Sequence, residues 1–331
     1  MSDTPFIITI DTEGDDLWSK PRQITTRNAG YLPRFQSLCE RYGFKPVYLT
    51  NYEMAMCDAF VEFGRDVAER NAGEIGMHLH AWNSPPLVPL TRDDFRHQPY
   101  LTEYPDQVMR DKVRFITHLL QDRFERTVSS HRAGRLGFDG RYAAILLAEG
   151  YRVDCSVTPG LDWRPNLGDP AGGGGVDYRS FPDRPYFLAP SDIAAPAASG
   201  LLEVPVTIRP SGLYRMASWI YRLPLVRGVA NDLAPGLSWM GPVQPTMDAP
   251  LERNLETMLN AESAARAGSV SHVEFMMHSS ELMPGGNPLF RNASDIERLY
   301  DYLEALFERL AAWCRGTTLE EFHARMTTAG A

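Results

Sequence analysis

FIITIDTEGDD (residues 6–16) is a short apolar run that leads directly into acidic residues. The run Phe6–Ile10 is rich in β-branched residues and too short for a stable helix, so it predicts a buried strand. Asp11 and Glu13 lie two apart just beyond it, and in an extended chain such side chains point to the same side. Both carboxylates can therefore face one point. The alternative is a solvated acidic turn, since two further aspartates follow.

Short apolar segments alternate with segments of helical period on both sides of this stretch, which is typical of βα units and a parallel sheet. We expect strands at Phe6–Ile10, Pro46–Thr50, Glu74–Met77, Thr127–Ser130, Arg152–Val157, Leu201–Ile208 and Val270–Met277. We expect helices at Tyr31–Tyr42, Asp58–Asn71, around Met109–Leu120, and at Arg141–Glu149, Leu251–Ala267 and Asp295–Trp313.

Two local sequence signals predict where the last helix begins and where the βα pattern is interrupted. Ser294 followed by Glu297 predicts a capping box at the start of the last helix. Between about residues 159 and 200 a glycine tract and many prolines interrupt the periodicity, which predicts a long irregular loop insertion. A length of 331 residues allows two domains or one large α/β barrel. Because the motifs described below run from Asp11 to His278, we expect one barrel domain over residues 1–331 that carries this insertion.

The charge balance excludes one class of partner. Lys and Arg number 33 and Asp and Glu 42, so the 331 residues carry a formal net charge of −9. Sequence-independent binding to nucleic acid or to an anionic membrane needs clustered positive charge, so we expect neither. A hydrophobic fraction of 44% and a charged fraction of 23% are those of a globular chain with a sizeable core, which excludes disorder as the dominant state.

No targeting or membrane-spanning segment is evident. No apolar run approaches the roughly 18 residues that span a bilayer, and the first residues lack the basic region and cleavage site of a signal peptide. We therefore expect a cytoplasmic protein without integral membrane association. The four cysteines are scattered with no paired spacing, so we expect small buried residues rather than disulfides or a structural zinc site.

A pair of histidines repeats the same-side geometry of the acidic pair. His78 and His80 lie two apart at the end of the strand predicted over Glu74–Met77, so both imidazoles can reach one cation. Together with Asp11 or Glu13 they make a set of one carboxylate and two histidines, which is typical of catalytic zinc sites. Nickel, cobalt and manganese also accept these ligands. The alternative for each histidine is a hydrogen-bonded core residue.

Other polar residues follow the ends of later strands. Arg132, Asp154 and His278 lie at or near the ends of three predicted strands. In a parallel barrel the carboxyl ends of the strands converge on one face. We therefore expect these residues to share a site with the acidic pair and the two histidines.

These residues stand in motifs that carry a family resemblance. The motifs, in order, are ITIDTEGD (residues 8–15), EIGMHLHAWN (74–83), HRAGR (131–135), VDCSV (153–157) and EFMMHSSE (274–281). Their order resembles that of the polysaccharide deacetylases, also called carbohydrate esterase family 4 or the NodB-homology family. The resemblance is strongest to the WalW-like lipopolysaccharide-biosynthesis branch.

The resemblance implies a distorted (β/α) barrel, commonly of seven strands. It also implies a hydrolase that uses a divalent metal, zinc in the first place, to remove an N-acetyl group from an amino sugar. The sugar would belong to a polysaccharide, a lipopolysaccharide or a glycan precursor, so the expected partner is a carbohydrate or glycolipid. The sequence carries no signal for an oligomeric state.

Site roles follow from the motifs residue by residue. Asp11 matches the catalytic base, His78 a metal ligand, Arg132 the arginine that holds the base, and His278 the general acid.

Two departures change the ligand set. Thr12 stands where the family usually has a metal-binding aspartate, so Glu13 must take that role. Trp82 stands four residues after His78, where the family usually has a second histidine, so His80 is an inferred replacement.

Three further residues have two interpretations each. Asp154 can favour the charged form of His278 or act as a loop acceptor. Arg135 can neutralise an acidic substrate or pair with a surface carboxylate. Trp82 can stack on a sugar or act as a packing anchor.

Two other function classes fit the same residues. One is hydrolysis of a small, for example cyclic, amide on the same barrel. The other is a non-catalytic carbohydrate-binding protein that has lost the metal through its altered motifs.

Overall fold

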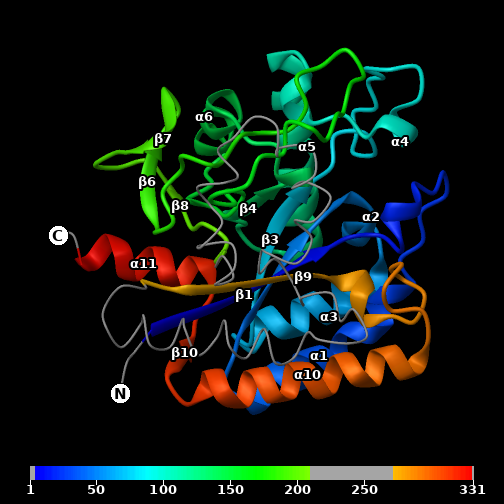
Figure 1. The fold of residues 1–331 in the computed structure, drawn as a ribbon, viewed down its shortest axis with the longest axis vertical. Helices are drawn as coiled ribbons and strands as arrows, with labels where there is room; N and C mark the ends of the chain where they lie inside the picture. The colour runs from blue at the N-terminus through cyan, green and yellow to red at the C-terminus, as the bar shows by residue number, and fades with distance from the viewer. Residues whose placement is uncertain (1–3, 209–270, 330–331) are drawn as a thin grey trace, which may run out of the picture.

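One sheet organises the computed structural model, which describes residues 4–208 and 271–329 (Figure 1). Its strands are β1 Thr4–Thr12, β2 Pro46–Thr50, β3 Glu74–Leu79, β4 Ser130–Ala133, β5 Val153–Asp154, β6 Tyr186–Ala189, β7 Asp192–Pro196, β8 Leu201–Glu203, β9 Val273–His278 and β10 Cys314–Gly316. The order is β10-β1-β2-β3-β4-β5-β8-β6-β7, with β9 also paired to β1. Neighbours from β9 through β1 to β5 and β8 are parallel, so their carboxyl ends share one edge.

Helices connect the strands and cover the sheet. They are α1 Leu32–Arg41, α2 Tyr52–Ala55, α3 Asp58–Glu69, α4 Asp94–His97, α5 Asp106–Phe124, α6 Gly140–Ala148, α10 Ala293–Ala311 and α11 Leu319–Ala329. Short 3-10 turns include η1 Leu17–Ser19, η2 Arg27–Tyr31, η3 Leu101–Glu103, η4 Gly134–Leu136 and η7 Ser279–Leu282. In Figure 1, α1, α3 and α10 lie below β1 and β9, and α5 and α6 lie above. Among the described helices, none is at once long and apolar enough to cross a membrane.

The expected α/β class with a parallel sheet is confirmed, and the strand count of seven is not. The sheet of the described residues has ten strands, because the antiparallel hairpin β6–β7 and the short β10 extend it. Within the described ranges β8 pairs with β5 and β6 but not with β9. Contacts outside the ladder join these two regions instead: His272 Nε2 lies 2.8 Å from Pro205 O, and Glu274 N donates to Thr207 Oγ1 at 2.8 Å.

The segment around residues 159–200 is only partly irregular. Residues 159–185 contain no helix or ladder strand, as expected, apart from an isolated bridge between Asp162 and Asp177. The prediction is wrong for 186–196, which forms the β6–β7 hairpin. Tyr186 and Leu188 alternate with less buried neighbours and pack inward, and β6 pairs with β8. The hairpin joins the sheet through β8, the next strand along the chain, which in turn pairs with β5.

Other boundaries also differ from the expected ones. Helix α10 is capped by Asn292, whose side chain accepts from Asp295 N in a capping box with Asp295, rather than by Ser294 and Glu297. Strand β4 begins at Ser130 rather than Thr127, because its ladder to β5 begins there. The expected helix Leu251–Ala267 lies outside the described residues. Of the four free cysteines, Cys39 and Cys155 are buried and the other two are half-buried.

An aromatic cluster holds α10 against the sheet and α1. Phe307 is fully buried. Its ring lies 5.4–6.3 Å, between centroids, from the rings of Phe6, Phe35, Tyr42, Phe44 and Phe275. The cluster therefore joins β1, β9, α1 and α10 through one side chain.

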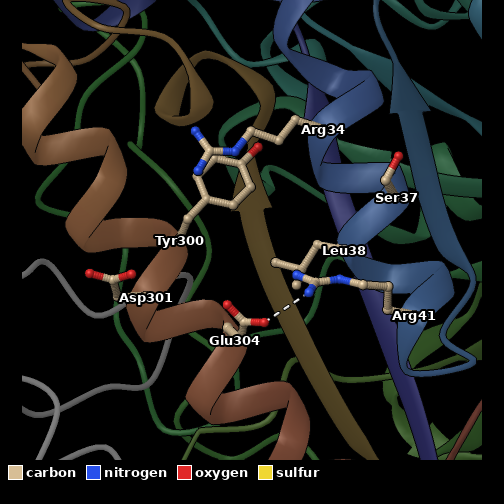
Figure 2. Close-up of a pocket in the computed structure, with 7 residues that line it drawn as sticks. All are labelled: Arg34, Ser37, Leu38, Arg41, Tyr300, Asp301 and Glu304. Atoms are coloured by element: carbon tan, nitrogen blue, oxygen red, sulfur yellow. Dashed lines mark ion pairs between the residues drawn. The ribbon is translucent and has the colours of Figure 1, made fainter.

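The outer rim of the α1–α10 contact is polar. Figure 2 shows the Arg34 guanidinium on the Tyr300 ring, 3.7 Å from its centroid, and Arg41 Nη1 is 2.9 Å from Glu304 Oε1. Arg34 also donates to both carboxylate oxygens of Glu297, at 2.7 Å each. Exposed ion pairs of this kind contribute at most about 1 kcal/mol each to the stability of the fold. We therefore assign this surface to helix docking rather than to chemistry.

The cluster makes α10 a sensitive point of the fold. We expect Phe307→Ala to lower the free energy of unfolding by about 3–5 kcal/mol, because it removes a fully buried ring from a close-packed site. Urea unfolding followed by circular dichroism measures the change. Phe115→Ala, which removes a 39% exposed ring from α5, is the matched control and should lower the free energy of unfolding by about half as much or less, because less apolar surface is lost. If Phe307→Ala lowered the free energy of unfolding no more than the control does, Phe307 would not be the side chain that holds α10 against the sheet.

Candidate metal centre and active site

Four of the predicted site residues meet as two cross-strand pairs. Asp11 on β1 lies opposite His278 on β9, and His78 on β3 lies opposite Arg132 on β4. Asp11 and His78 are each 2% exposed and Arg132 is fully buried. Parallel pairing thus places all four at the carboxyl edge of the sheet.

Glu13, His78 and His80 form a cluster of potential metal ligands. His80 Nε2 lies 2.8 Å from Glu13 Oε2 and 3.1 Å from His78 Nε2. His78 Nε2 lies 3.6 Å from Glu13 Oε2. Ligands of a tetrahedral zinc ion with bonds near 2.1 Å are about 3.4 Å apart. The three atoms are therefore spaced as ligands of one cation.

Backbone contacts orient His78 and His80 toward the ligand cluster. His78 Nδ1 lies 3.0 Å from Arg132 O, so Nδ1 donates a proton to that carbonyl and Nε2 is the atom turned toward the cluster. A Cβ at Gly134 would lie 2.8 Å from His80 Nδ1 and closer still to Leu79 O. Only glycine lets the chain pass His80 at this distance.

Two of the three potential ligands, Glu13 and His80, are held in the charge state that suits a cation. Burial alone would raise the pKa of Glu13, but hydrogen bonds from His78 and His80 hold it well below its ordinary value. Burial lowers the pKa of His80. Burial also opposes the charged form of His78, but the charge of Asp11 and the hydrogen bond with Glu13 raise its pKa, so a metal that binds His78 would displace a proton. A carboxylate and a neutral imidazole are the forms that bind metal.

Asp11 is held by a buried guanidinium. Arg132 Nη1 donates to Asp11 Oδ1 at 2.7 Å, while Nη2 donates to Thr9 Oγ1 at 2.8 Å and to Glu274 Oε1. Burial opposes ionisation of Asp11, but the charges of His78 and Arg132 hold its pKa below the ordinary value. Oδ2, the other oxygen, lies 3.8 Å from His78 Nε2 and 3.9 Å from His278 Nε2. Asp11 is thus an oriented carboxylate with one oxygen turned toward the two imidazoles.

His278 is paired with Glu281, a residue that the sequence analysis did not assign. Nδ1 of His278 lies 3.2 Å from Glu281 Oε1. Burial opposes the charged imidazole, but Glu281, followed by Glu13, raises the pKa of His278 to about 9. The sequence held a signal for this pair, because Glu281 follows His278 by three residues within the quoted motif at 274–281.

The predicted pairing of Asp154 with His278 is wrong. Asp154 Oδ1 lies 2.5 Å from His131 Nδ1, and His131 Nε2 lies 2.7 Å from Tyr142 OH. Both residues of the first pair are fully buried. Register decides this outcome, since Asp154 on β5 lies opposite His131 on the neighbouring β4. Asp154 therefore braces two strands.

Arg135 and Trp82 are occupied by other contacts. Arg135 donates to the backbone oxygens of Gln98 and Leu167, and its guanidinium lies 4.2 Å from the Tyr100 ring centroid. The structure favours loop bracing over the predicted substrate contact. Trp82 is 4% exposed and its ring lies 5.7 Å from that of His80, so it lines the buried side of the ligand cluster.

Comparison with known proteins finds similarity of fold only. No protein-family profile matches the sequence, and no curated protein is significantly similar to it. A protein from Parabacteroides distasonis, assigned as a glycoside hydrolase/deacetylase, has a TM-score of 0.62 and 10% identity over 98% of this chain and 71% of that one. A protein from Mycobacterium smegmatis, assigned as a polysaccharide deacetylase, has a TM-score of 0.54 and 12% identity over 99% and 92%.

A third protein of similar fold carries the name of a transferase rather than of a deacetylase. The 4-alpha-glucanotransferase from Thermococcus litoralis has a TM-score of 0.51 and 11% identity, and this chain covers 40% of its length. The resemblance to polysaccharide deacetylases is therefore confirmed for the fold. Because one fold serves several reactions, function must come from the site.

The ligand cluster can be tested by metal content. After incubation with zinc and exhaustive dialysis, we expect the protein to retain about one ion per chain, and His78→Ala to lower the affinity at least about 100-fold, because it removes one of three protein ligands. Mass spectrometry of the metal measures both. His118→Ala, which removes an exposed imidazole on α5, should bind like the unaltered protein. Zinc retention by His78→Ala would contradict the ligand set.

Proposed function

We propose that this protein is a metal-dependent hydrolase that removes the N-acetyl group from an amino sugar of a polysaccharide, lipopolysaccharide or glycan precursor. One arrangement carries the proposal: a held carboxylate, Asp11, and a paired imidazole, His278, lie on one side of the cluster of Glu13, His78 and His80. The likeness of the fold to assigned deacetylases supports it. The cytoplasmic location expected from the sequence stays a prediction.

The ligand cluster suits a divalent ion, zinc in the first place, with nickel, cobalt or manganese as alternatives. An ion held by Glu13, His78 and His80 would acidify a bound water and polarise the acetyl carbonyl. The convergence of all three ligands favours an enzyme over a binding protein that has lost its metal. Hydrolysis of a small amide needs the same groups, so the substrate is tested below by acetate release from sugars.

Asp11 serves as the general base. Its Oδ1 is fixed by Arg132, so Oδ2 stays aimed at the space between His78 and His278 and takes the proton from the attacking water. The lowered pKa keeps Asp11 ionised at neutral pH. Glu274 and Thr9 hold Arg132 in turn, so the base is oriented by contacts to its own and to the neighbouring strand.

His278 serves as the general acid. Its Nδ1 faces Glu281, so Nε2 is the atom that delivers a proton to the leaving nitrogen as the carbon–nitrogen bond breaks, giving acetate and a free amine. The raised pKa keeps the imidazole protonated at neutral pH. Its side chain is 26% exposed, so a substrate can reach it from solvent.

The base can be tested by an isosteric change. We expect Asp11→Asn to lower the rate of acetate release from N-acetylated sugars, nucleotide sugars or lipopolysaccharide core fragments by about 10²–10⁴-fold, because the amide cannot take a proton. An enzyme-coupled acetate assay measures it. Asp111→Asn, on the surface of α5, should behave like the unaltered protein. If Asp11→Asn released acetate as fast as the unaltered protein, Asp11 could not be the general base.

The acid can be tested by its pH dependence. A general acid works while protonated, so on the basic side kcat/KM falls as the pH rises through the pKa of His278, about 9. On the acidic side it falls only when Asp11, the base, becomes protonated. Glu281→Gln removes the paired charge and lowers this pKa, so we expect the basic limb of the pH profile to move down by about one pH unit. Activity at low pH should change little.

The control for this change is Glu297→Gln, which neutralises an exposed carboxylate on α10 paired with Arg34. Its pH profile should match that of the unaltered protein. A basic limb that stays in place in Glu281→Gln would exclude Glu281 as the partner that charges His278.

A further inference from the structure

Trp18 presents an exposed indole beside the proposed general acid. Its ring centroid lies 5.0 Å from that of His278, with the two planes at 74°. Trp18 is 41% exposed, whereas Trp82 and Trp313 are each 4% exposed. A single exposed apolar residue is common and carries no meaning alone. The contact with a half-exposed residue of the site is what distinguishes Trp18.

The turn that carries Trp18 is anchored on both sides. Leu17, the preceding residue, is 6% exposed and packs inward. Asp16 N donates to Gly286 O at 2.9 Å, and Lys20 Nζ donates to Arg96 O at 2.7 Å. These contacts join the turn to the loop after His278 and to the region of α4. Trp18 is therefore presented from a fixed turn rather than from a free loop.

The backbone of this turn is strained. Asp16 and Lys20, which flank η1, have φ values of 47° and 54°, in the left-handed region that non-glycine residues rarely adopt. Such conformations are unfavourable for non-glycine residues and concentrate at active sites and ligand-binding sites. The anchored turn therefore holds the Trp18 ring 41% exposed and in contact with His278.

The reaction proposed at His278 indicates which part of a substrate would lie against the indole ring of Trp18. In the proposed reaction His278 Nε2 protonates a nitrogen that is bonded directly to the sugar ring, so that ring must lie next to His278. Among the residues that the structure describes, Trp18 is the exposed aromatic side chain whose ring contacts His278. The C–H face of a pyranose is apolar and matches the face of an indole, as aromatic surfaces bind flat apolar partners with a polar rim.

We propose that Trp18 is the platform on which the acetamido-bearing pyranose ring of the substrate stacks. The proposal rests on the proposed function, and it names the substrate class as a hexosamine with an accessible C–H face. The tryptophan singled out from the sequence, Trp82, is buried and does not serve this purpose.

Binding tests the proposal without turnover. With a tetramer of N-acetylglucosamine as the probe and protein treated with a chelator, calorimetry should show that Trp18→Ala weakens binding about ten-fold and Trp18→Phe, which keeps a smaller ring, weakens it less. Phe115→Ala removes a 39% exposed ring on α5 and should bind like the unaltered protein. Thermal unfolding of each variant checks that it is folded.

Turnover separates stacking from an effect on His278. On the tetramer, Trp18→Ala should lose about ten-fold in kcat/KM, chiefly through KM. On N-acetylethanolamine, which has an acetamide but no ring, the loss should be several-fold smaller. Equal losses of kcat/KM on the tetramer and on N-acetylethanolamine would mean that Trp18 acts through His278, which would overturn the proposal that it stacks on the sugar ring.

The two proposals fail in different ways. Weaker binding of the tetramer by Trp18→Ala without acetate release by any variant would support the platform and refute the deacetylase. Acetate release with unchanged tetramer binding and kinetics in Trp18→Ala would refute the platform alone. Failure of the unaltered protein to bind the tetramer would also overturn the platform.

Discussion

The buried guanidinium of Arg132 is the interaction on which the rest of the site depends. It contacts Asp11 and Thr9 on β1, Glu274 on β9 and, through Nε at 3.0 Å, the carbonyl of Cys155 after β5. Removing one partner of such a buried charge network costs about 3–5 kcal/mol, because it leaves an uncompensated charge. One side chain from β4 thus fixes the relative positions of strands that are far apart in sequence.

Arg132 also connects the two halves of the site. Its side chain orients Asp11 while its backbone oxygen accepts from His78 Nδ1. The base and one ligand of the metal cluster are therefore set by a single residue. Its two buried carboxylate partners differ, since burial raises the pKa of Glu274 to about 7 while neighbouring positive charges lower that of Asp11. Asp11, which faces the cluster, is therefore the more strongly ionised of the two.

The altered motif Asp-Thr-Glu has a geometric explanation. Strand β1 ends at Thr12, so Asp11 and Glu13 project to one side and Thr12 to the other, where its hydroxyl donates to Ile10 O at 3.0 Å. Glu13 is fixed further by Ser279 Oγ, which accepts from its backbone nitrogen at 3.1 Å, and by Asn28, which donates to its carbonyl at 2.8 Å. A ligand one residue later thus remains compatible with the same cluster.

The sequence by itself determined the strands and helices that local hydrophobic periodicity encodes, such as Pro46–Thr50, which the structure reproduces, and the same-side pairs Asp11 with Glu13 and His78 with His80. Only the tertiary structure decided which distant side chains meet. Register paired Asp154 with His131, the turn after β9 placed Glu281 on His278, and loop packing buried Trp82 while exposing Trp18. The physical reason is that spacing along one strand is fixed by covalent geometry, whereas contacts between elements depend on the packing of the whole chain.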